Sequence, residues 1–211
     1  DIASCLVGSE MCIRDRPPYL VLEYVDGQPL SDFATPDTLL PVPQVLDIAF
    51  KCCNALEYAY REGLVHRDIK PANLMLAHGG DVKLTDFGAA LSLRSDATQL
   101  SGLVGSPSYM SPEQVREQDL THHSDMFSLA VVVYELLTGR RPFDGDTDFA
   151  TLYKISNETP TRPSLLRASL PAHVDEVLLR ALAKQPADRF ATWADFAQAL
   201  LAAHRGLCLL Y

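Results

Sequence analysis

The sequence has little positive charge, no long apolar run and no metal-type cysteine spacing. It contains 18 lysine and arginine residues against 27 aspartate and glutamate residues, a formal net charge of −9. A chain this acidic offers no basic face for a phosphate backbone, so we expect no nucleic-acid partner. The longest nearly unbroken apolar run, residues 127–137, is interrupted by Glu135 and is too short to cross a bilayer. We therefore expect no membrane segment in this chain.

The cysteines are few, odd in number and scattered. There are 5 of them, and none has the spacing of a metal-ligand pair. Without a signal peptide, this pattern is typical of a reducing cytosol. We expect a cytoplasmic location for this segment and leave open a membrane anchor elsewhere in the parent protein. The adjacent Cys52 and Cys53 are interpreted as packing residues of a helix.

The hydrophobic pattern indicates strands first and helices afterwards. At 211 residues and 47% hydrophobic, the chain can bury one sizeable core. Helical spacing of apolar residues runs through residues 45–60, with Gly63 as a stop, and through 125–137, 174–183 and 193–203. Strands are predicted at residues 19–25, ended by Asp26-Gly27, and at 74–76 and 82–84 around a Gly79-Gly80-Asp81 turn. This order predicts a helix-dominated α+β fold.

Five short motifs follow one another in the middle of the chain. They are HRDIKPANLML (66–76), DFG (86–88), GSPSYMSPE (105–113), SDMFSLAVVVYELLTGRRPF (124–143) and PADRF (186–190). A short motif alone is weak evidence of function, because a lone Asp-Phe-Gly is more often a turn than a metal-binding loop. In this order they resemble the protein kinase family, in particular bacterial serine/threonine kinases. The resemblance covers residues 17–207 and implies the helical C-terminal lobe, the short hairpin and a residual hinge strand of the kinase fold.

The resemblance implies phosphoryl transfer from ATP with magnesium. Asp68 would orient the substrate hydroxyl and accept its proton, and Lys70 would stabilise charge on the transferring group. Asn73 and Asp86 would hold the metal, because their oxygens suit a hard cation. Ser106 stands where a hydroxyl residue bridges Asp68 and Lys70, and together with Lys70 it indicates serine/threonine rather than tyrosine specificity. The implied partner is a protein substrate with such an acceptor, and autophosphorylation is one form of that reaction.

The resemblance also assigns nucleotide-binding and structural residues. The Glu23 carbonyl and the Val25 amide would bond the adenine edge, with Met75 as its floor, while Asp86 reaches the nucleotide through the metal. Further residues implied by the family are the pocket guard Leu22, the stacked pair His66 and Phe87, the buried pair Glu113 and Arg189, and Asp125, expected to hold the catalytic-loop amides and to cap its helix.

Arg67, next to Asp68, resembles the arrangement in kinases switched by activation-loop phosphorylation. The candidate acceptors are Ser92, Ser95, Thr98 and Ser101.

Departures from the family pattern are small except at the start. Ala130, Ser111 and Ser106 replace residues of similar size. The sequence has no glycine-rich phosphate loop and no strand lysine, so the N-terminal lobe is expected to be missing from it. A pseudokinase acting as a binding module is therefore an alternative to an active kinase. A small-molecule phosphotransferase of the aminoglycoside or choline type is a third reading, which Lys70 and the Pro112-Glu113 segment disfavour.

Both ends resemble translated sequencing adapter. Residues 6–15, LVGSEMCIRD, are similar to the in-frame translation of a transposase-type adapter, and residues 208–211, CLLY, to its opposite strand. We expect residues 1–16 and 208–211 to be non-native and residues 17–207 to be the kinase segment.

Overall fold

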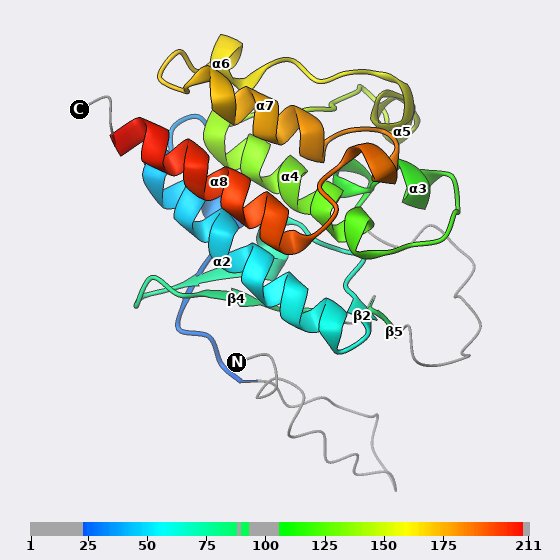
Figure 1. The fold of residues 1–211 in the computed structure, drawn as a ribbon, viewed down its shortest axis with the longest axis horizontal. Helices are drawn as coiled ribbons and strands as arrows, with labels where there is room; N and C mark the ends of the chain where they lie inside the picture. Colours follow the sequence, from blue (N-terminus) through cyan, green and yellow to red (C-terminus); the bar gives the residue numbers. More distant parts are fainter. Residues whose placement is uncertain (1–22, 88–89, 93–105, 209–211) are drawn as a thin grey trace, which may run out of the picture.

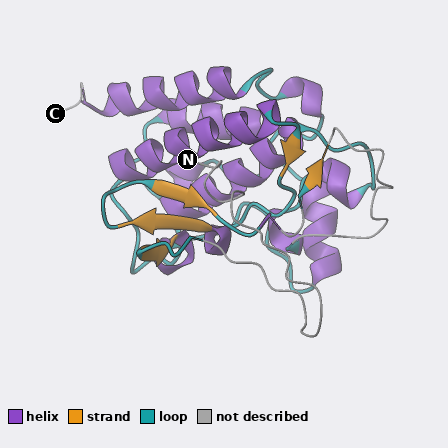
Figure 2. Ribbon diagram, turned by 90° about the horizontal axis from the view of Figure 1, so that it is seen from below, coloured by secondary structure: helices purple, strands orange, loops and turns teal. Residues whose placement is uncertain are grey.

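The computed structural model describes residues 23–87, 90–92 and 106–208. Its helices are η1 (Leu30–Phe33), α2 (Val42–Arg61), η2 (Pro71–Asn73), η4 (Pro107–Tyr109), α3 (Pro112–Val115), α4 (His122–Thr138), α5 (Asp148–Asn157), α6 (Pro163–Leu166), α7 (Ala172–Ala181), η5 (Pro186–Asp188) and α8 (Trp193–Cys208). Its strands are β1 (Gly27–Pro29), β2 (Leu64–Val65), β3 (Leu74–Ala77), β4 (Val82–Leu84) and β5 (Leu91–Ser92). The predicted α+β fold with mostly helical content is confirmed (Figure 2).

Three long helices form the centre of the molecule. α2 packs against both α4 and α8, and Figure 1 shows these three helices side by side. Nearly every residue of α4 is buried, which matches its apolar sequence on all sides. α2 is amphipathic, and its buried stripe includes Val45, Ala49, Cys52 and Leu56. α4 therefore has little freedom to move, and any residue it carries toward the surface is held rigidly.

Two small antiparallel sheets lie on one side of the helices. The larger has the order β1-β3-β4, and the smaller pairs β2 with β5 (Figure 2). In the larger sheet Met75 is opposite both Pro29 and Lys83. The β3–β4 turn has the predicted position, since the Ala77 amide bonds Asp81 O at 2.9 Å and Gly80 has a φ of 82°.

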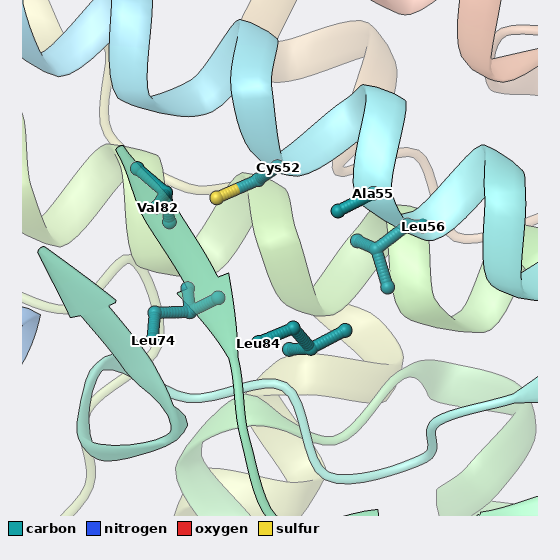
Figure 3. Close-up of a pocket in the computed structure, with 6 residues that line it drawn as sticks. All are labelled: Cys52, Ala55, Leu56, Leu74, Val82 and Leu84. Atoms are coloured by element: carbon teal, nitrogen blue, oxygen red, sulfur yellow. The ribbon is translucent and has the colours of Figure 1, made fainter. Parts of the chain in front are cut away.

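The sheet meets α2 through an apolar seam. Leu74, Val82 and Leu84 line it from the strands, and Cys52, Ala55 and Leu56 line it from the helix (Figure 3). The space between them is too narrow for a water molecule. Burial raises the pKa of the Cys52 thiol to about 12, so this cysteine is a packing residue as predicted.

The long predicted elements are confirmed within a few residues, and one prediction is wrong. The ranges 45–60, 125–137, 174–183 and 193–203 fall in α2, α4, α7 and α8, and Gly63 ends α2 with a φ of 80°. The strand predicted at 19–25 is not observed in its described part, because residues 23–26 are irregular and the strand is Gly27–Pro29. Asp26-Gly27 was predicted to end a strand, but Gly27 begins β1 and lies so close to β3 that a Cβ would be 2.3 Å from Leu76 O. Glycine is required there by the close approach of two strands.

Two further observations concern membrane-spanning helices and the two ends of the chain. None of its helices is both long and apolar enough to cross a membrane. The adapter segments predicted at the two ends lie outside the described residues, apart from Cys208 at the end of α8.

Candidate active site

The loop between β2 and η2, residues 66–70 and called the Asp68 loop below, is fixed by a buried carboxylate from α4. Asp125 accepts hydrogen bonds from the backbone amides of His66, at 2.8 Å, and Arg67, at 2.9 Å. From α3, Gln114 Nε2 donates to the Arg67 carbonyl at 2.8 Å. These bonds hold Arg67 at a φ of 67°, a backbone conformation that costs a non-glycine residue about 1–3 kcal/mol. The loop is thereby preset to present the next residue, Asp68.

Asp68 is the centre of a four-residue cluster. Lys70 Nζ lies 2.7 Å from Asp68 Oδ2 and also donates to Ser106 Oγ at 3.2 Å. The Ser106 amide donates to Asp68 Oδ1 at 3.1 Å. Asn73 Nδ2 donates to Asp68 O at 2.9 Å and to its Oδ2 at 3.2 Å. The structure thus brings Asp68, Lys70 and Asn73 of the motif at residues 66–76 together with Ser106 of the motif at residues 105–113.

The cluster keeps Asp68 ionised. Burial opposes the charge of this carboxylate, but the Lys70 ammonium and then the Ser106 amide and the Asn73 side chain outweigh it. As a result the pKa of Asp68 lies below its ordinary value. A carboxylate of low pKa is a good hydrogen-bond acceptor for a hydroxyl and a weak base, which suits orienting a nucleophile more than full deprotonation.

Thr85 links the Asp68 loop to Asp86. Its amide donates to Asn73 O at 2.9 Å, and His66 Nε2 donates to its carbonyl at 3.1 Å. Asp86 follows at a φ of 60° and is exposed, so its carboxylate is presented on the surface of the described chain. Phe87 lies against His66 with ring centroids 4.9 Å apart, as predicted for this pair. The hydrogen bond between Thr85 and Asn73 therefore fixes the backbone of Asp86 relative to that of Asn73.

The residues assigned to the nucleotide base lie at the β1-β3-β4 sheet. Met75 is on β3, half-buried, directly opposite Lys83 of β4. Lys83 pairs with the Glu23 carboxylate, which precedes β1 in the chain. Val25, two residues on, is half-buried and outside any helix or strand. Leu22 lies outside the described residues, as do Ser95, Thr98 and Ser101, while only the backbone of Ser92 is described.

A buried ion pair fastens the segment after Ser106 to the helices. Arg189 donates from Nη1 and Nη2 to the two carboxylate oxygens of Glu113, at 2.7 and 2.8 Å. The Arg189 side chain is 0% exposed and that of Glu113 is 3% exposed. Ser124 donates to Glu113 at 2.8 Å. Although burial opposes its charge, the Arg189 guanidinium holds the pKa of Glu113 below its ordinary value. The predicted pair is confirmed as a contact.

The sequence-based interpretation of this region was wrong at one residue and missed another. Asp125 holds the loop amides as expected, but it does not cap α4. The cap is Thr121, whose side chain accepts a hydrogen bond from the His123 amide and forms a capping box with Ser124. Gln114 was not recognised, because its bond to Arg67 joins residues 47 apart in the sequence and no local pattern indicates it.

Comparison with known proteins agrees with this geometry. The family model described as "Protein kinase domain" matches residues 8–202. The chain is 39% identical over 191 residues to a serine/threonine-protein kinase PknB of Mycobacterium leprae, covering 90% of this chain and 31% of the relative. It is 41% identical over 194 residues to a probable serine/threonine-protein kinase PknB of Bifidobacterium longum, covering 90% of this chain and 28% of that protein. The chain therefore spans about a third of the length of these relatives.

Proposed function

The chain belongs to the protein kinase family, and we propose that its parent transfers the γ-phosphoryl group of ATP to serine or threonine hydroxyls of proteins. The observation that carries the proposal is the cluster around Asp68, in which one carboxylate is held by a lysine, an amide side chain and a backbone amide. Phosphoryl transfer is catalysed mainly by positioning and charge stabilisation, and this cluster supplies both.

Asp68, Lys70 and Ser106 have different roles in phosphoryl transfer. Asp68 orients the acceptor hydroxyl, because it is ionised and hydrogen bonds to both oxygens fix its direction, and it receives the hydroxyl proton only as transfer proceeds. Lys70, 2.7 Å from Asp68, places a positive charge where negative charge develops during transfer. Ser106 joins these two residues to the segment fastened by Glu113. A substrate bound along that segment meets Asp68 and Lys70 together.

The donor set fits magnesium and ATP. Asn73 turns its Nδ2 to Asp68, which leaves the amide oxygen as its metal-binding atom, and Asp86 contributes an exposed carboxylate. Oxygen donors of this kind are the ligands that Mg²⁺ prefers. Magnesium ATP, when bound, supplies the phosphoryl group and partly neutralises its charge. The Glu23 carbonyl, the Val25 amide and Met75 would hold the adenine.

Specificity for serine and threonine is supported by Lys70 and Ser106, which occupy the positions expected in kinases of that type. The relatives carry the same activity in their names. We include autophosphorylation of the segment containing Ser92, Ser95, Thr98 and Ser101 in the proposal. A phosphate there would add a charge that an arginine such as Arg67 can pair.

The test uses the parent protein with its N-terminal lobe. Transfer of labelled phosphate from ATP to a protein substrate is measured for the wild type, for Asp68→Asn and for the control Asp47→Asn, which changes an exposed carboxylate on α2. We expect Asp68→Asn to lower the rate by several orders of magnitude and the control to leave it unchanged. Label on serine or threonine supports the proposal. A wild-type protein that binds ATP but transfers nothing would establish the pseudokinase alternative.

A further inference from the structure

One face of the β1-β3-β4 sheet packs against α2, while Met75 and Lys83 of the same sheet are each half-buried. Leu74 on β3 and Val82 and Leu84 on β4 point to α2, where they line the apolar seam (Figure 3). Side chains alternate between the two faces of a strand, so Met75, which follows Leu74, and Lys83, which lies between Val82 and Leu84, point to the opposite face. Lys83 is therefore the neighbour of the residue assigned as the adenine floor.

Lys83 also contacts the segment that leads into the sheet. Its ammonium pairs with the Glu23 carboxylate, and the two side chains are 32% and 40% exposed. Residues 23–26 form no helix or strand, and at the other end of this segment Asp26 O accepts from the His78 amide at 3.2 Å. The segment that carries the Glu23 carbonyl and the Val25 amide is thus fastened to the β3–β4 hairpin at both ends.

We propose that Lys83 is a positioning residue for the nucleotide, because through Glu23 it fastens the hinge segment, residues 23–26, beside the sheet face that carries Met75. This inference rests on the proposed function, since it assigns Lys83 a part in the same ATP site. Lys83 acts on the nucleotide through the hinge and does not take part in phosphoryl transfer. Its loss weakens ATP binding and leaves the chemical step unchanged.

The size of the effect follows from the exposure of the pair. Both side chains are about one-third exposed, so their attraction is screened by water. An ion pair of this kind corresponds to a change in binding of about two- to five-fold. The expected signature is therefore a modest rise in the KM for ATP with unchanged kcat, which a general loss of folding does not produce.

The experiment is a charge-exchange cycle in the parent protein. Lys83→Met and Glu23→Gln should each raise the KM for ATP and the Kd of a non-hydrolysable ATP analogue by about two- to five-fold, and the double variant should be no worse than either. Exchanging the charges, with Glu23→Lys and Lys83→Glu together, should recover most of the affinity.

Lys51→Met is the matched control for this cycle. Lys51 is 35% exposed, pairs with Asp47 and bonds Gly80 O of the same hairpin at 2.8 Å, but from α2. We expect it to leave both constants unchanged.

The readouts separate this inference from the proposed function. Hydrogen exchange of a peptide covering residues 23–26 should be faster in Lys83→Met than in the wild type or in Lys51→Met, with or without measurable catalysis. Additive losses in the double variant, or no recovery on charge exchange, would overturn the positioning role while wild-type activity stands. A wild type without phosphoryl transfer would refute the proposed function. Hydrogen exchange of residues 23–26 and the Kd of the ATP analogue would then still test the hinge contact.

Discussion

At the scale of single residues, the site depends on what surrounds one carboxylate. Asp68 is partly withdrawn from water, which alone would raise its pKa, yet its contacts with Lys70, Ser106 and Asn73 keep that pKa low. The same three contacts fix the direction of the carboxylate. Ionisation and orientation therefore have one cause, and a single substitution in the cluster should change both.

Lys70→Met in the parent should show this coupling. Without the ammonium, less opposes the effect of burial and the pKa of Asp68 rises, so the acid limb of the kcat profile should move to higher pH. We also expect kcat near neutral pH to fall by about 100-fold, because a charge that stabilises the transition state is lost. Lys70→Arg should restore part of the rate. An acid limb that stays in place in Lys70→Met would show that this lysine does not control Asp68.

Glu113→Gln should lower stability in a pH-dependent way. Removing one partner of a buried ion pair costs about 3–5 kcal/mol at pH 7. The folded-state pKa of Glu113 is lowered, so its contribution is present above its unfolded value and is lost as the pH falls through the folded value. Urea unfolding should therefore show a difference between wild type and variant that shrinks below pH 4.5.

The control for this substitution is Asp144→Asn. Asp144 pairs with Arg141 at the surface and is 59% exposed, so its loss should cost less than about 1 kcal/mol. A constant difference between wild type and Glu113→Gln from pH 7 down to pH 3 would contradict the assigned ionisation of Glu113.

At the scale of elements, α4 links the core to the Asp68 loop. It is buried along nearly its whole length, and Asp125 near its start bonds two amides of the loop. The cap of the same helix, Thr121, makes no bond to that loop among its described contacts. The helix therefore offers two nearby positions, of which one should affect catalysis and the other only stability.

Asp125→Asn and Thr121→Ala in the parent test that division. A hydrogen bond to a charged group contributes about 1.5–3 kcal/mol, so Asp125→Asn should lower both stability and kcat. Thr121→Ala should cost about 1 kcal/mol of stability with kcat unchanged. Comparing unfolding midpoints with kcat for both variants is the measurement. Equal losses of kcat in the two variants would mean that α4 acts on the site only through its stability.

Gly27→Ala should disrupt the strand that follows the hinge. A Cβ at Gly27 meets Leu76 O at 2.3 Å, so β1 must move away from β3, at a cost of about 1–3 kcal/mol. Gly79→Ala is the control, because a Cβ there has no atom of the described chain within 4 Å. We expect a lower melting temperature and a higher KM for ATP in Gly27→Ala alone. Equal melting temperatures would show that β1 and β3 adjust without cost.

The elements also show what a sequence can predict. Long apolar periodicities indicated α2, α4, α7 and α8, because burial against a core decides both the pattern and the helix. α5 was missed, since its outer side exposes Phe149 and Tyr153, which obscure the periodicity. The family motifs placed Asp68, Lys70 and Asn73 within a few residues of one another. The Gln114 and Lys83 contacts could not be predicted, because they depend on how distant segments pack.

At the scale of the whole molecule, the described chain has the mostly helical fold expected of its family, with the β1-β3-β4 sheet packed against the helices. α4 holds the Asp68 loop through Asp125, and α2 contacts both α8 and β4 (Figure 1). The β1-β3-β4 sheet carries Met75, and the hinge segment leads into its first strand. The sequence contains no glycine-rich loop and no strand lysine, the family features that position and neutralise the phosphates. We expect the chain alone to hold the base and the metal ligands without being able to align ATP.

The measurement that tests this account most directly is complementation of the chain by an N-terminal lobe. Magnesium-dependent transfer of labelled phosphate is compared for the 211-residue chain alone, for the chain fused after its native N-terminal lobe, and for the fusion carrying Asp68→Asn. The account predicts transfer by the fusion only, because positioning and charge stabilisation of the phosphates each lower the barrier by several kcal/mol. Transfer by the chain alone that Asp68→Asn abolishes, or transfer by the fusion that Asp68→Asn leaves intact, would contradict it.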